Sequence, residues 1–95
     1  MYSLRVLAKG QVSDLSKGFN LGGKPFSVYV RSKSATEMAT DTLLNCKLIC
    51  DTSFGNIPVP VGDWTPAAIV EIAPNAIDLQ KYEIYWGAGE IIRNN

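Results

Sequence analysis

The chain has 95 residues, and its nine basic residues balance its nine acidic ones, so its formal net charge at pH 7 is zero. A chain of this length forms one domain with a thin core, and an apolar content of 46% argues against a disordered polymer. A protein that binds nucleic acid usually carries a basic surplus to neutralise phosphates, and because none is present we expect no nucleic-acid partner.

The N-terminal segment is interrupted by charge at Arg5 and Lys9. A signal peptide needs an uninterrupted apolar stretch, and a membrane helix needs about 20 consecutive apolar residues. Neither pattern is found, so we expect a protein made in the cytoplasm, without a signal peptide and without a membrane partner.

Residues 4–7 are the first, weak strand candidate, and turn-forming residues follow at Lys9-Gly10 and Ser16-Lys17-Gly18. The segment from Gly18 to Lys24 matches the Gly-x4-Gly-Lys part of a phosphate-binding loop. The next position should carry a hydroxyl for magnesium, but it is Pro25, and a strand pattern follows instead of the required helix. We therefore predict a glycine turn with a positive φ at Gly22, Gly23 or both.

Residues 26–31 alternate as a half-buried strand. Phe26, Val28 and Val30 share one parity, and Ser27, Tyr29 and Arg31 share the other. The next segment opens with Ser34-Ala-Thr-Glu37, which fits a helix capping box. Three threonines and Asp41 argue against a stable helix, so the pattern predicts a polar connection with room for one helical turn.

Residues 44–50 form a second strand pattern, whose apolar face consists of Leu44, Cys46, Leu48 and Cys50. Ile49 breaks the alternation, which predicts that this strand is central or contacts a neighbour on its second face. Cys46 and Cys50 would lie about 13 Å apart on a strand, from ~3.3 Å per residue, whereas a disulfide needs Cα atoms within about 7 Å. We expect two free thiols, buried on the same face.

The remaining strand candidates are residues 57–61, 69–72, 81–86 and 90–93. Pro58 and Pro60 remove two backbone donors, so residues 57–61 belong at a sheet edge or in an extended loop. Turn signals at Gly55-Asn56, Gly62-Asp63, Pro74-Asn75 and Gly87-Ala88-Gly89 separate the runs. The pattern predicts one all-β domain over residues 1–95, with a strand-rich core at about 26–93. Its architecture would be a small antiparallel β-sandwich, jelly-roll-like, or a barrel of about seven short strands.

Catalytic and metal-binding arrangements can be screened by residue type. The chain contains no histidine, which excludes Ser–His and Cys–His pairs and histidine metal ligands. The carboxylates show no spacing that selects a catalytic pair. We expect no enzyme activity, no cofactor and no metal site.

The aromatic residues are the remaining candidates for a binding surface. Tyr29 lies on the more polar parity of its strand, Trp64 follows the turn at Gly62-Asp63, and Tyr85 precedes Gly87. Exposed aromatic rings can stack on sugars or fill a partner's pocket. Tyr29, Trp64 and Tyr85 are therefore the predicted partner or glycan contacts, with the alternative that Trp64 caps one end of the sandwich. Trp86 shares the parity of Ile84 and is predicted to be a core residue.

Four segments of the second half of the chain carry a likeness to a known group of proteins: Leu43-Leu-Asn-Cys-Lys-Leu-Ile-Cys-Asp51, Ile57-Pro-Val-Pro-Val-Gly-Asp-Trp64, Ala68-Ile-Val-Glu-Ile-Ala-Pro74 and Tyr82-Glu-Ile-Tyr-Trp-Gly-Ala-Gly89. With these segments, residues 26–92 resemble small β-rich virion proteins of tailed bacteriophages. The similar proteins are capsid auxiliary or decoration proteins and the capsid-anchoring parts of head fibres. The resemblance implies a structural role in the virion, self-association, and docking on a capsid lattice.

Three hypotheses follow for the function. The first is a structural virion protein that forms a dimer or trimer through strand edges and apolar faces and contacts the major capsid protein or other virion proteins. The second is a small carbohydrate-binding module that uses the exposed aromatics. The third is a tail or baseplate subunit.

Overall fold

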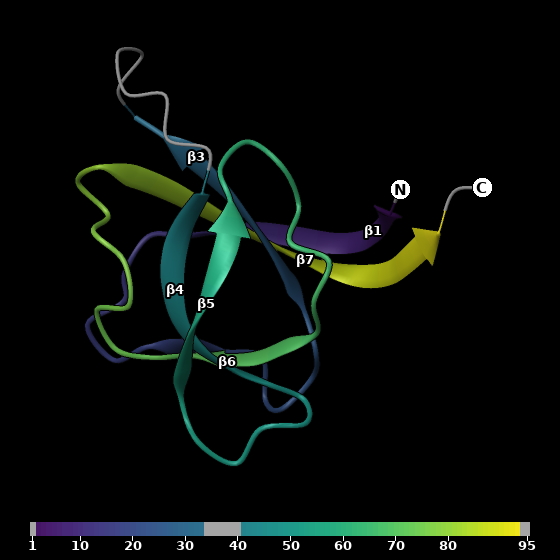
Figure 1. Ribbon diagram of the computed structural model, residues 1–95, viewed down its shortest axis with the longest axis horizontal. Helices are drawn as coiled ribbons and strands as arrows, with labels where there is room; N and C mark the ends of the chain where they lie inside the picture. The colour runs from purple at the N-terminus through teal and green to yellow at the C-terminus, as the bar shows by residue number, and fades with distance from the viewer. Residues whose placement is uncertain (1, 34–40, 94–95) are drawn as a thin grey trace.

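The computed structural model describes residues 2–33 and 41–93, whose seven strands form two antiparallel sheets (Figure 1). The first sheet has the order β1 (Tyr2–Val12), β7 (Tyr82–Arg93), β3 (Ser27–Ser32). The second has the order β2 (Phe19–Asn20), β6 (Ile69–Ile72), β4 (Asp41–Leu48), β5 (Gly55–Pro60). The all-β fold is confirmed as a sandwich-like pair of sheets that does not close into a barrel.

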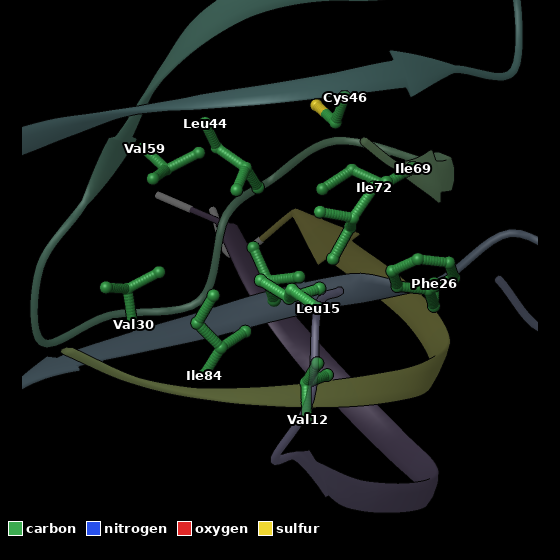
Figure 2. Close-up of a cluster of buried hydrophobic side chains, with 11 residues drawn as sticks. Val12, Leu15, Phe26, Val30, Leu44, Cys46, Val59, Ile69, Ile72 and Ile84 are labelled. Atoms are coloured by element: carbon green, nitrogen blue, oxygen red, sulfur yellow. The ribbon is translucent and has the colours of Figure 1, made fainter. Parts of the chain in front are cut away.

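The core lies between the two sheets (Figure 2). Its fully buried side chains come from both: Val28, Val30 and Ile84 from the first sheet, and Leu44, Val59, Ile69 and Ile72 from the second. Burying one such side chain contributes roughly 1.5–3 kcal/mol. The sheets also join at one corner, where Phe26 and Ile69 exchange two backbone hydrogen bonds of 2.8 Å.

The alternating pattern of residues 28–31 identified the two faces of β3 correctly, although Ser27, on the outer parity, is buried. Val28 and Val30 point into the core while Tyr29 and Arg31 do not. The strand β4 is central, between β6 and β5, as predicted. The reason given for this was wrong, because Ile49 lies in the turn after β4 and is 65% exposed. The edge position predicted from Pro58 and Pro60 is confirmed by β5.

Two predicted turns are instead the interiors of long strands. Lys9-Gly10 lies inside β1, and residues 87–89 lie inside β7, which continues from Tyr82 to Arg93. In β1 the glycine makes room for a large neighbour, because a Cβ on Gly10 would lie 2.6 Å from Nε1 of Trp86. Glycine within a strand often marks such a close approach. The strands therefore begin at Tyr2, so the strand-rich part of the domain includes the N-terminal segment.

The cysteine prediction is partly wrong. Both thiols are free, and Cys46 is buried in the core, but Cys50 is exposed. The strand ends at Leu48, where Asp51 N donates to the Leu48 carbonyl at 2.9 Å and closes a turn. Cys50 therefore leaves the face on which Cys46 lies.

The predicted turns at Gly18, Gly22-Gly23 and Gly62 are confirmed, whereas the turn predicted at Gly55-Asn56 is wrong, because both residues pair with β4 at the start of β5. Both Gly22 and Gly23 have positive φ, as do Gly18 and Gly62. The predicted connection with its capping box falls on residues 34–40, which lie outside the described residues, while Asp41 and Thr42 already belong to β4.

We expect Gly18→Ala to destabilise the fold more than Gly22→Ala. Both residues have φ near +70°, which strains any other residue, but only at Gly18 would a Cβ contact backbone, 2.6 Å from the Ile72 carbonyl oxygen. The expected loss in free energy of unfolding is about 1 kcal/mol for Gly22→Ala and about 2 kcal/mol or more for Gly18→Ala. Urea unfolding measures both. Equal losses would contradict a steric role for the Ile72 contact.

We expect only one of the two thiols to react quickly with a thiol reagent near neutral pH, and Cys50→Ser to abolish that reaction. Burial, and secondarily the charge of Asp51, raises the pKa of Cys46 from 9.0 to about 11. The folded state thus favours the neutral thiol.

The raised pKa of Cys46 also makes stability depend on pH. Its contribution to the free energy of unfolding is complete below pH 9.0 and is lost as the pH rises towards about 11. Urea unfolding across this range should show a steeper fall in stability for the wild type than for Cys46→Ala. An equal fall in stability with pH in the wild type and in Cys46→Ala would contradict a raised pKa at Cys46.

Candidate partner-binding surface

The fold brings the three predicted contact residues together in one row. Tyr29 and Tyr85 are directly paired across β3 and β7. Trp64 forms a β-bridge with Tyr29, and the two rings meet edge to face with centroids 5.6 Å apart. We call Trp64, Tyr29 and Tyr85 the aromatic row.

The aromatic row lies on the outer face of the first sheet. Directly paired residues of antiparallel strands place their side chains on the same face, and the next pair, Val30 and Ile84, is fully buried on the other face. Tyr29, Trp64 and Tyr85 are each half-buried. Their rings are therefore supported by the sheet and remain accessible from outside.

Trp64 reaches the row because the connection between β5 and β6 follows the outer edge of β3. Gly62 N donates to the Val30 carbonyl at 2.7 Å, and Thr65 N donates to the Val28 carbonyl at 2.9 Å. The Ser27 hydroxyl also donates to the Thr65 carbonyl. The positive φ of Gly62 allows the chain to turn into this position. The segment 61–65 thus covers the β3 edge and holds Trp64 beside Tyr29.

Polar groups flank the row on the same face. Gln11 of β1 pairs with Tyr85. Arg31 of β3 and Glu83 of β7 form the pair two residues along, which is the next pair on the outer face. The Tyr85 hydroxyl donates to Glu83 Oε2 at 2.7 Å. This hydrogen bond is the main cause of the raised pKa of Tyr85, and the positive charge of Arg31 opposes it. The face therefore combines aromatic rings with hydrogen-bonding groups.

The other aromatic and apolar candidates differ from this row. Trp86 lies on the core side, where it is partly buried and packs against the buried cluster, as predicted. Leu43, Ile49 and Phe54 are exposed near the second sheet. The ion pair between Lys47 Nζ and Glu71 Oε1, at 3.7 Å, and the stacking of Lys47 over the Phe54 ring interrupt that surface.

The phosphate-loop motif is divided in the structure, because Phe19 and Asn20 form β2 and Gly22 and Gly23 form a turn. Within residues 2–33 and 41–93, no group of three or more Cys, Asp or Glu side chains is placed to hold a metal ion. The same residues contain no helix long and apolar enough to cross a membrane.

The fold and the surface together define the structural class of the protein, which is an all-β, two-sheet domain with an aromatic row on one outer face. No protein-family model matches the chain, and neither curated proteins nor solved structures include a significant match to it.

Sequence reasoning selected the three aromatic residues but missed Gln11, Arg31 and Glu83 as their neighbours. Arg31 and Glu83 share strand parity with Tyr29 and Tyr85, which was the available signal. The sequence alone does not show that β3 pairs with β7, more than 50 positions further along the chain. That pairing brings the aromatic residues and the polar residues onto one face.

We expect Glu83→Gln to lower the pKa of Tyr85 towards its ordinary value, because a neutral amide replaces the carboxylate that favours the protonated phenol. Ultraviolet titration of tyrosinate, with Tyr85→Phe to assign the signal, measures the change. Glu71→Gln on the second sheet is the matched control and should leave the titration unchanged. An identical Tyr85 titration in wild type and Glu83→Gln would contradict the hydrogen bond.

Proposed function

We propose that this chain is a non-catalytic structural protein of a tailed-bacteriophage virion, of the capsid auxiliary, decoration or head-fibre type. It is made in the host cytoplasm, self-associates, and docks on the capsid through the aromatic row. The observation that carries the docking surface is the convergence of Trp64, Tyr29 and Tyr85 on one outer face.

The physical properties of the row support its use as an interface. Tyrosine, tryptophan and arginine dominate the residues whose loss most weakens protein interfaces, and Arg31 lies beside the row. The zero net charge provides little repulsion between copies in a dense assembly. One of the segments that carry the resemblance to virion proteins, Ile57 to Trp64, contains the end of β5 and leads to Trp64 in the row.

A second candidate is a carbohydrate-binding module at the same face. The specific observation in its favour is the presence of Gln11, Arg31 and Glu83 around the rings. A sugar ring stacks its apolar face on an aromatic side chain while its hydroxyl groups need hydrogen-bonding partners. Both requirements are met on this one surface.

We expect Trp64→Ala to weaken binding to capsid shells of the encoding phage by about tenfold or more, as truncation of a large aromatic anchor does. Co-sedimentation at fixed shell concentration measures it. Phe54→Ala is the matched control, since it removes an exposed aromatic ring from the connection between β4 and β5, away from the row, and it should bind like wild type. Circular dichroism checks that both variants fold.

The alternatives give distinct outcomes in the same experiment. Binding to purified tails but not to shells would assign the chain to the tail or baseplate. Binding on a glycan array that Trp64→Ala abolishes would support the carbohydrate module, and an array without signal would remove it. Equal binding of wild type and Trp64→Ala to shells would contradict docking through the row.

A further inference from the structure

A hollow lies directly beside the aromatic row on the outer face of the first sheet. Ser27 of β3 and Gly87 of β7 are directly paired, two residues from Tyr29 and Tyr85 and therefore on the same face. Two residues of a strand span about 7 Å. The hollow has a volume of about 210 Å³, and its lining includes Pro25, Ser27, Ala67, Ala68, Gly87 and Gly89. The proposed docking surface therefore continues from the row into this hollow.

The hollow is part of the folded chain and does not need a partner to form. The glycines that line it have no side chain, and the alanines have a single methyl group each. The Ser27 hydroxyl donates to the Thr65 carbonyl, and Phe26 and Ile69 exchange two backbone hydrogen bonds. Residues 66–68 are held between these two contacts. A site that is already formed binds more tightly than one that must first be ordered.

The size and the walls of the hollow suit one aliphatic side chain. An apolar cavity of about 150 Å³ holds benzene, so a hollow of about 210 Å³ has room for a side chain as large as leucine. The hydroxyl of Ser27, which is the polar side-chain group of the lining, already donates its proton to the Thr65 carbonyl. The hollow therefore favours an apolar group over a sugar, whose hydroxyl groups need hydrogen-bonding partners.

The charge next to the hollow is positive. Lys9 of β1 pairs directly with Gly87, so it lies on the outer face beside the hollow, and it is exposed. Among the described residues, Lys9 takes part in no ion pair. Arg31 and Glu83 lie on the far side of the row and face each other across β3 and β7, so their charges compensate locally. A carboxylate on the partner would thus be attracted to the Lys9 side of the hollow.

We propose that the hollow receives one aliphatic side chain, of about the size of leucine, from the capsid protein on which the aromatic row docks. Lys9 binds a carboxylate that neighbours this side chain in the same segment. The inference deepens, and rests on, the docking included in the proposed function. Burial of the aliphatic side chain beside Tyr29 and Tyr85 removes its apolar surface from water and adds to the contacts made by the rings.

Filling the hollow from within the chain is the first test. Ala68→Leu occupies the space with a side chain of the protein itself and should weaken binding to capsid shells by about tenfold or more in co-sedimentation. Ala76→Leu is the matched control, because it is the same change at a half-buried alanine beside a different hollow, between residues 13–16 and 75–79. It should bind like wild type. Circular dichroism checks the fold of both variants.

The second test uses the isolated wild-type protein and a peptide probe, so it depends neither on shells nor on a variant that folds. The peptide acetyl-Glu-Glu-Leu-Glu-Glu-amide is compared with the same peptide carrying a central alanine. Amide chemical shifts of Ala68, Gly87 and Gly89 should follow binding, and the leucine peptide should bind about tenfold more tightly.

The same titration tests the role of Lys9. Lys9→Glu should weaken binding of the leucine peptide several-fold at low salt, because it replaces an attractive charge by a repulsive one. Lys17→Glu makes the same charge change at an exposed residue of the turn between β1 and β2 and should bind the peptide like wild type.

Equal binding of the leucine and alanine peptides, or no response at the residues that line the hollow, would overturn the inference. Shell binding by Ala68→Leu that equals wild type would do the same, and loss of binding in Trp64→Ala would then leave the docking proposal intact. A wild type that binds the leucine peptide but no shells would refute capsid docking alone. Binding on a glycan array that Ala68→Leu abolishes would assign the hollow to a sugar and overturn the aliphatic side chain as its occupant.

Discussion

The pairing of β3 with β7 aligns Val30 with Ile84 and Tyr29 with Tyr85 in a single register. Because successive residues of a strand face opposite sides of a sheet, that register decides the contents of both faces at once. A slip of one residue would bring the tyrosines into the core and expose the valines. Burial of Val28, Val30 and Ile84 against the second sheet therefore also holds the aromatic row outside.

The second sheet depends on the same strand. The backbone of Phe26 pairs with Ile69 just before β3 begins, and segment 61–65 follows the β3 edge after β5 ends. Both connections are made by backbone groups of β3 or its immediate neighbour. They fix the two sheets relative to each other, and one of them places Trp64 against Tyr29. The aromatic row therefore forms because the two sheets are joined along the β3 edge.

The alternation of residues 26–31 and the prolines near residue 58 predicted strand faces and an edge strand because these signals are local. Glycine was less informative. At Gly18 and Gly22 it allows a positive φ in a turn, but at Gly10 it accommodates the Trp86 ring within a strand. Composition cannot separate these two uses, since the second depends on a residue far along the chain. The aromatic residues could likewise be selected from the sequence, whereas their adjacency required long-range pairing.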